Sequence, residues 1–359
     1  MFTKYKKIYF KSLYIFFSFL SLIIFFFSTT KVNGKAFEIG NIEISKPFQM
    51  NFNKNEVIND GFEKAFEELI LLILNSSDQK KIDDIKLNEV RGMIDTFSIK
   101  EEKFINEIYY VKMGVAFDKK KIFNFLEKKN IFPSIPTKKD FLFIPVIIDE
   151  NEKELLIFSK NKFFTDWTDN KKSFHLINYI LPTEDLEDLN VLKQNFQNIE
   201  QYNFKEITDK YFLQDTIIAL IFKSDKELRI LSRISLDNNI ILKNETYPYI
   251  DINNSEQVKD IIENLKIVYE DYWKNANQIN TSIKLMLNIK VDSSKISKIS
   301  IFEKTLNTED LIYEFSIFKF DNNYIYYQVI FNGTPNYFLK TMGEKNFNFD
   351  TQNKIWILK

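Results

Sequence analysis

The first 34 residues constrain this chain more than any other stretch. Lys4, Lys6, Lys7 and Lys11 precede an uncharged run from residue 12 to residue 30. The centre of that run reads FFSFLSLIIFFF, and the segment contains no Asp or Glu. A positive start followed by an apolar stretch is typical of a secretory leader, because the translocon accepts the apolar part while the cations stay in the cytoplasm. The pattern therefore predicts that the rest of the chain works outside the cytoplasm.

The same segment has two alternative interpretations. Cleavage after Gly34 would leave small or short residues at the two sites that a signal peptidase reads. Roughly 17 strongly apolar residues follow Lys11, fewer than the ~20 that a spanning helix needs, but residues 12–30 could still form an uncleaved inner-membrane anchor. A buried core helix is the second alternative, which the flanking lysines and the polar sequence STTKVNGK disfavour.

Composition narrows the function classes. Without residues 1–34, the 359-residue chain keeps about 325 residues, enough for two or three domains. Its net charge is then about −6, so it has no electrostatic reason to bind nucleic acid. The absence of cysteine excludes disulfides, a thiol nucleophile, Cys-ligated zinc and lipid attachment at a leader cysteine. The seven glycines form neither GxxxxGK nor GxGxxG, so no nucleotide site or other cofactor is predicted.

Residues 35–135 predict a small α+β module, which we call the first module. FEIGNIEIS (37–45) alternates apolar and polar residues like a half-buried strand. Asn55 can cap a helix over 56–75 with apolar residues at spacings of three and four. A helix over 87–94, a strand over 107–118 and a helix over 119–129 complete an order of strand, helix, helix, strand, helix.

This module resembles a known family. The succession FEIGNIEIS, GFEKAFEELI, VRGMIDTFSIKEEKF, IYYVKMGVAF and IFNFLEKKNI is similar to the opening of an envelope protein family of Gram-negative bacteria, catalogued as domain of unknown function 2066. The resemblance implies export to the periplasm or cell envelope and no established activity. The module is also similar in pattern to the amino-terminal module of a flagellar assembly protein, which implies a scaffolding role by analogy.

Residues 136–279, the middle module, predict an α/β sheet with parallel members. The continuous apolar run 141–149 indicates a strand buried on both faces. Further strands are expected at 155–158, 177–181 and 216–222, with helices at 185–198 and 204–211. An antiparallel pair turning at 237–239 and a long helix capped by Ser255 close the module. The family resemblance extends here through LPTEDLEDLNVL and FFTDWTDN, although relatives are expected to carry Gly-Asp in place of Thr183-Glu184.

The middle module holds the candidate chemistry. Glu184, Asp185 and Asp188 follow a predicted parallel strand, and Asp166 lies earlier in the module. Carboxylates at the carboxyl edge of such a strand could hold Ca²⁺ or Mg²⁺. The structural alternative is that these acids stabilise the first turn of a helix capped by Thr183, and the sequence favours it.

His175 is the sole histidine, so any Ser-His-Asp arrangement would have to use it. It lies at the edge of a predicted strand, and no GxSxG is present. Metal sites that need two histidines are excluded, and a structural or exposed role is favoured.

Residues 280–359 predict a third module of ferredoxin-like order β-α-β-β-α-β. The strand 281–291 precedes a helix over 294–306, and a hairpin turning at 321–323 follows. Pro335 starts a short helix, and the final extended segment forms one strand or two short ones. The tyrosine-rich strand around 324–327 is expected to be half core and half surface.

Two functions remain from the sequence. The first is a non-catalytic envelope protein of three mixed α/β modules that acts on unidentified envelope proteins as an interaction or assembly factor. The second is an exported hydrolase or cation-dependent enzyme using Asp166, Glu184, Asp185 and Asp188. The first is favoured because the chain has little equipment for catalysis. Membrane contact is expected only through the N-terminal segment.

We expect the native protein to be recovered from the envelope or periplasmic fraction with Lys35 as its first residue. Cell fractionation followed by N-terminal sequencing measures both. Recovery of the intact chain, starting at Met1, dissolved in the cytosol would contradict the export prediction.

Overall fold

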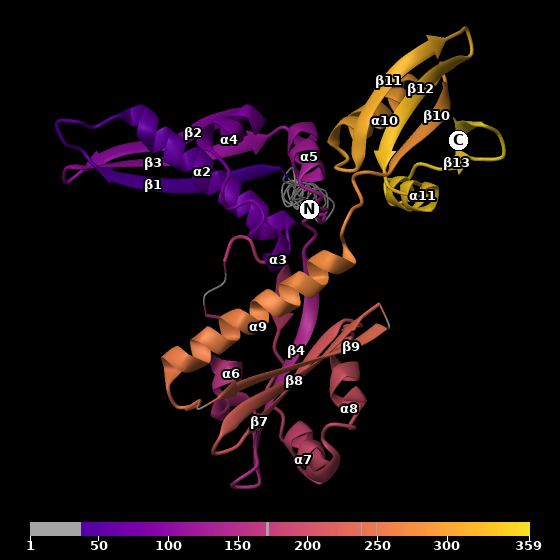
Figure 1. Ribbon diagram of the computed structural model, residues 1–359. Coiled ribbons are helices and arrows are strands. Elements are labelled where there is room, and N and C mark those ends of the chain that lie inside the picture. Colours follow the sequence, from indigo (N-terminus) through magenta and orange to yellow (C-terminus); the bar gives the residue numbers. More distant parts are fainter. Residues whose placement is uncertain (1–36, 170–171, 238, 249) are drawn as a thin grey trace, which may run out of the picture. The chain divides into compact units, whose positions relative to one another are not determined.

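The computed structural model describes residues 37–169, 172–237, 239–248 and 250–359 (Figure 1). This part of the chain is mixed α+β, with about 35% helix and 35% strand, which confirms the predicted class. It contains three sheets, and residues 36–359 form one compact unit. The predictions for residues 12–30 and for Gly34 lie outside the described residues.

The first sheet has the order β1-β3-β2 and is antiparallel throughout. Its core lies between one face of the sheet and α2, where Phe62, Phe66 and Leu69 meet Met113 and Val115. The strands are β1 (Glu38–Pro47), β2 (Ile94–Ile105) and β3 (Ile108–Phe117). The helices are α2 (Lys54–Ile73), α3 (Ser76–Gln79), α4 (Leu87–Met93) and α5 (Lys119–Lys128).

The strand β2 was not predicted, and the element order of the first module was therefore wrong. Its sequence, IDTFSIKEEKFI, contains four consecutive charged residues and leaves nearly every side chain exposed. A bulge between Ile99 and Glu101 also breaks the alternation on which the prediction depended. The predicted cap of α2, Asn55, was also wrong. The cap is Asn53, whose side chain accepts a hydrogen bond from the backbone amide of Asn55.

The middle sheet has the order β5-β4-β7-β8-β9, and β6 pairs with β4. β4 runs parallel to both β6 and β7, as predicted, and almost all of its side chains are buried. The strands are β4 (Lys139–Asp149), β5 (Glu154–Leu156), β6 (Ile177–Ile180), β7 (Thr216–Lys223), β8 (Glu227–Leu236) and β9 (Asn239–Pro248). The helices are α6 (Lys162–Thr165), α7 (Leu186–Gln194), α8 (Lys205–Thr208) and α9 (Ser255–Ala276), with 3₁₀ turns at Phe158–Lys160, Phe196–Asn198 and Asp209–Tyr211.

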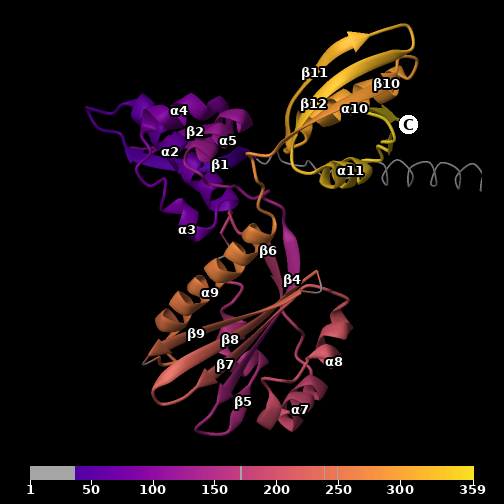
Figure 2. The ribbon, with the colours of Figure 1, turned by 45° about the vertical axis from the view of Figure 1, so that its right-hand side comes forward.

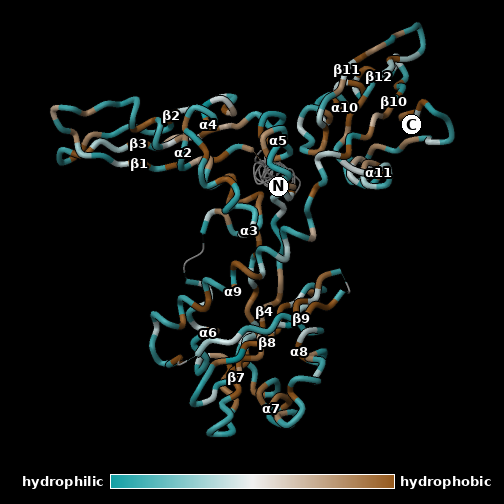
Figure 3. Tube along the Cα trace, in the orientation of Figure 1, coloured by the Kyte–Doolittle hydropathy of each residue, from teal (hydrophilic) through white to brown (hydrophobic). Residues whose placement is uncertain are grey.

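The two faces of this sheet bury separate cores. Phe141, Phe143 and Ile147 of β4 point to the face covered by α6 and α9. The alternate residues of β4, such as Leu142 and Val146, point to the face covered by α7 and α8. Because both faces are covered, β4 and β7 carry hydrophobic residues in succession (Figure 3).

The observed cap of α9 lies one residue before the predicted cap. Asn254, not Ser255, accepts backbone hydrogen bonds from Glu256 and Gln257. The helix then runs for 22 residues along the middle sheet (Figure 2). Its length follows from the apolar stripe that includes Ile261, Leu265 and Tyr269, all buried in the core.

The third module forms a five-stranded sheet of order β11-β12-β10-β14-β13. Its elements are β10 (Lys284–Asp292), α10 (Ile296–Thr308), β11 (Ile312–Phe320), β12 (Tyr324–Asn332), α11 (Pro335–Gly343), β13 (Phe349–Asp350) and β14 (Ile355–Leu358). The predicted order holds up to α11, and the final extended segment forms two short strands, one of the two forms that the sequence allowed. β14 pairs with β10 in parallel, whereas the last strand of a regular ferredoxin-like sheet runs antiparallel to the first.

The two linkers that enter and leave the middle module pair with each other. Ser134 and Gln278 form an isolated antiparallel bridge, and the Ile279 amide donates to the Pro133 carbonyl at 2.8 Å. The Gln278 side chain adds a hydrogen bond to the Phe132 carbonyl at 2.9 Å. The middle module therefore begins and ends at one place in the structure.

In the described residues, no helix combines the length and apolar character needed to cross a membrane.

We predict that Phe143→Ala costs about 3–5 kcal/mol of unfolding free energy, because it empties the centre of the middle core. Phe143 is fully buried and stacks on Trp167, with ring centroids 3.8 Å apart. Urea unfolding followed by tryptophan fluorescence measures the change. Phe212→Ala is the matched control, since Phe212 is 95% exposed, and we expect it to stay within about 0.5 kcal/mol of the wild type. Equal effects of the two substitutions would contradict this packing.

Candidate functional site

Two of the predicted acidic residues meet at one lysine. Asp185 caps α7 by accepting the Glu187 amide at 2.8 Å, so the predicted cap, Thr183, was wrong. Lys210 donates to Asp185 and to Asp188, at 2.7 Å in each case. The hydrogen bond from Lys210 lowers the pKa of Asp185. Asp188 is only 3% exposed and lies in the first turn of α7, which agrees with the structural interpretation of the acids.

The other two predicted acids lie apart from that pair. Glu184 accepts the Ser159 amide at 3.1 Å, and Asp166 ends α6 and accepts the Thr165 hydroxyl at 2.7 Å. Within the described ranges, no group of three or more His, Asp or Glu side chains is arranged to hold a metal ion. The four residues therefore do not form one site.

Three charged side chains of α9 are buried on one side of the helix. Lys266, Glu270 and Lys274 are spaced four residues apart and are 4%, 4% and 5% exposed. Charged residues are almost never buried to this degree unless their charges are satisfied. The apolar period of α9 predicted only an amphipathic helix. The signal for the buried charges is the recurrence of charge at positions i, i+4 and i+8 of one helical face.

Each of these charges binds the backbone of a different segment. The Glu270 carboxylate accepts the amides of Leu176 at 3.0 Å and Ile177 at 2.9 Å. Lys274 donates to the Leu71 carbonyl near the end of α2, at 2.5 Å. These bonds join α9 to the start of β6 and to the first module.

The third charge, Lys266, binds the segment that follows α6. It donates to the carbonyls of Trp167 and Asp169, at 2.6 Å and 3.2 Å. Its ammonium also lies 5.3 Å from the ring centroid of Trp167, a cation–π distance.

Burial shifts the pKa of all three groups toward their neutral forms. It raises the pKa of Glu270, although the amides of Ile177 and Leu176 and the charge of Lys274 act in the opposite direction. Burial lowers the pKa of Lys274, opposed by the charges of Glu270 and Asp271. It also lowers the pKa of Lys266, opposed by Glu263 and Asp169. Burial is therefore the main influence on the ionisation of these groups.

Further polar contacts join the first module to α9. We call the region where the end of α2 and the start of α3 meet α9 the seam. The amide and the hydroxyl of Ser76 donate to the two carboxylate oxygens of Asp271, at 2.8 Å and 2.5 Å. The Asn75 amide group donates to Asn275 at 3.0 Å. Asn75 and Ser76 lie at the start of α3, so the end of α2 is tied to α9 at several points.

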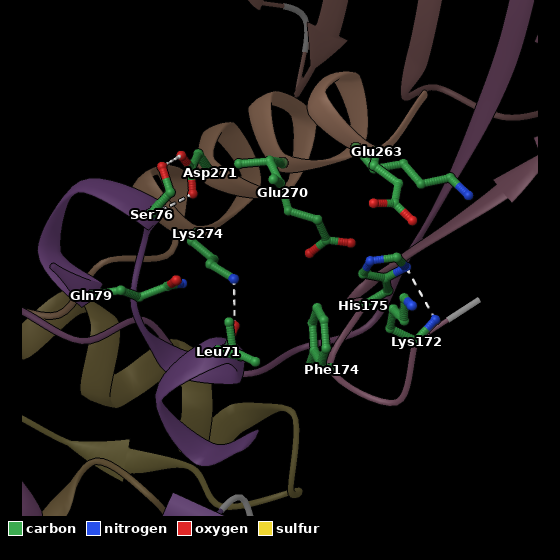
Figure 4. Close-up of a pocket in the computed structure, with 12 residues that line it drawn as sticks. Leu71, Ser76, Gln79, Lys172, Phe174, His175, Glu263, Glu270, Asp271 and Lys274 are labelled. Carbon is green, nitrogen blue, oxygen red and sulfur yellow. Dashed lines mark hydrogen bonds between the residues drawn. The ribbon is translucent and has the colours of Figure 1, made fainter. Parts of the chain in front are cut away.

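A small cavity of about 180 Å³ lies at this seam (Figure 4). Its walls come from α2 and α3, from α9, and from the segment before β6. The residues around it are Leu71, Ser76, Gln79, Lys172, Phe174, His175, Glu263, Lys266, Ile267, Glu270, Asp271 and Lys274.

His175 lies at the wall of this cavity and packs edge-on against Phe174, with ring centroids 5.1 Å apart. Its Nδ1 accepts the Lys172 amide at 3.4 Å. Glu270, the buried acid among the residues that line the cavity, already accepts two amides. The arrangement suits the binding of backbone and the exclusion of water better than proton transfer to a substrate.

Comparison with models of known protein families gives no match, and neither does a search of curated protein sequences.

We predict that Glu270→Gln lowers the unfolding free energy by about 1–3 kcal/mol, because the Gln side chain places an NH₂ donor where Glu270 Oε2 now accepts the Leu176 amide. An acid whose pKa is raised by folding binds its proton more tightly in the folded state. Wild-type stability should therefore fall as the pH rises from about 5 to about 7, and this component should be missing in the variant. The cost of the substitution is then larger at the lower pH.

Urea unfolding at the two pH values measures this difference. Glu263→Gln, at an exposed position of the same helix, is the control, and we expect its effect on stability to be small. A Glu270→Gln variant whose cost grows with pH would contradict the raised pKa of Glu270, because it would mean that the amides outweigh burial.

Proposed function

We propose that the protein is an exported envelope protein that acts without catalysis, as an interaction or assembly factor. The observation that carries the proposal is the use of the charged groups in the α9 region. Lys266, Glu270 and Lys274 all bind backbone groups, which makes them parts of a scaffold. A catalytic acid or base needs a proton-accepting or proton-donating position directed at a substrate.

The export part of the proposal rests on the N-terminal sequence. The lysine-led apolar run before Gly34 and the absence of cysteine agree with a protein that reaches the periplasm, either free or anchored through residues 12–30. The resemblance to domain of unknown function 2066 favours the same compartment, and the three modules with separate cores suit a chain that presents several surfaces.

The interaction part rests on where exposed apolar side chains lie. Three edge strands, β2, β9 and β11, carry nine of the large apolar side chains that are exposed in the described residues. These are Phe97, Ile99, Phe104 and Ile105 on β2, Ile240 and Leu242 on β9, and Ile317, Phe318 and Phe320 on β11. An edge strand offers unpaired backbone groups as well as side chains, so an extended partner segment can add to the sheet.

β11 is the edge best suited to such a partner. It pairs with β12 alone, so its second edge has no strand beside it in the described structure. Phe318 and Phe320 are 50% and 79% exposed, and Lys319 is the only charged residue between Ser316 and Asp321. β2, by contrast, carries the charged run from Lys100 to Lys103, a common protection against strand addition.

We predict that a photo-crosslinking amino acid at Phe318 captures a discrete envelope protein in cells that make the full chain natively. The same amino acid at Ile301, an apolar position of α10 that is 59% exposed, is the matched control and should give no discrete product. Gel electrophoresis and mass spectrometry of the products measure the difference. Equal products at the two positions, or none at Phe318, would contradict recognition through β11.

A further inference from the structure

We propose that the cavity beside α9 is a binding site for one small, uncharged, single-ring aromatic molecule. The proposal concerns a site separate from the edge strands, and it stands whether or not β11 binds a partner.

The size of the cavity sets the size of the ligand. An apolar cavity of roughly 150 Å³ holds one benzene molecule. The cavity here measures about 180 Å³, which leaves room for one ring with one small substituent. A nucleotide, a sugar chain or a drug-sized molecule needs several hundred Å³.

The charges around the cavity favour a ligand without net charge. Three cations, Lys172, Lys266 and Lys274, face three anions, Glu263, Glu270 and Asp271. Four of these six groups already hold protein atoms: Lys266 and Lys274 bind carbonyls, and Glu270 and Asp271 bind amides. The remaining two, Lys172 and Glu263, carry opposite charges, so the walls have no net charge to repay the lost hydration of a charged ligand.

The apolar side chains provide the surfaces that a ring needs. Leu71 and Phe174 lie on one side of the cavity, and Glu270 and Lys274 reach toward them from α9 (Figure 4). Ile267, which is 48% exposed, lies at the edge. Phe174 offers an aromatic partner for edge-to-face or offset packing.

A polar substituent on the ring has partners within the same walls. Glu270 Oε2 accepts only the Leu176 amide, at 3.1 Å, so a carboxylate oxygen retains capacity to accept a hydroxyl. A phenol therefore fits the site better than a ring without a substituent. A bound ring would contact α2 and α9 together and so would strengthen the seam between the first module and the middle module.

Phenol is the probe for the test. Isothermal titration of the purified full chain in a mild detergent should give a saturable dissociation constant on the order of 1 mM or tighter, as expected for so small a ligand. Benzoate and benzylamine, which carry a charge, should bind at least tenfold more weakly.

Two variants locate the binding. Ile267→Trp places a large side chain at the edge of the cavity and should weaken phenol binding at least tenfold. Ile296→Trp, at a 76% exposed position of α10, is the control and should leave binding unchanged. Uptake of phenol by the detergent is the same for every variant, so it cannot produce the difference.

Hydrogen exchange of the wild-type chain provides a second measurement that needs no variant. Phenol should slow exchange in residues 172–177 and 71–79, and leave the third module unchanged. No saturable binding, equal binding by Ile267→Trp, or unchanged exchange in both segments would each overturn the proposal.

Discussion

The attachment of buried α9 charges to distant backbone groups organises much of this structure. A buried charge costs several kcal/mol unless it is paired or hydrogen-bonded. The Glu270 carboxylate meets this requirement through the amides at the start of β6, and Lys274 meets it through the last turns of α2. Because each partner is a backbone group, these contacts fix chain segments in place, whatever side chains the segments carry.

The same helix connects the modules in two ways. Its apolar stripe forms one wall of the middle core, and its charged and polar residues hold the end of α2 and the start of α3 in the first module. At its carboxyl end the chain passes into the linker that pairs with the linker entering the middle module. A change in α9 would therefore affect the middle core, the seam and the linkers together. The small cavity at the seam is lined by this helix, so a ligand bound there would contact the element that connects the modules.

Sequence patterns predicted the regular elements well and the specific contacts poorly. The buried run of β4 and the hairpin of β11 and β12 were clear because their apolar residues have a distinct period. β2 was missed because an exposed, charged, bulged edge strand owes its existence to its partner β3 and has no apolar period of its own. The three caps were misplaced by one or two residues because more than one residue that can cap a helix, Asn, Asp, Ser or Thr, lies near each start.

The cavity could not be predicted from the sequence for a related reason. Its walls come from segments about 100 and 200 residues apart, and no local pattern records that Leu71, His175 and Glu270 meet. The acidic residues near α7 could be predicted as a candidate site, because their carboxylates lie close together in the sequence. In the structure, Asp185 and Asp188 both bind Lys210, whereas Glu184 accepts the Ser159 amide instead.

The central claim is that the buried carboxyl group of Glu270 holds the backbone amides at the start of β6. Amide hydrogen exchange of the full chain, compared between the wild type and Glu270→Gln, measures this most directly. The account predicts that exchange at Leu176 and Ile177 becomes at least tenfold faster in the variant, while the strands of the third module keep their wild-type rates. Unchanged exchange at both amides would contradict it.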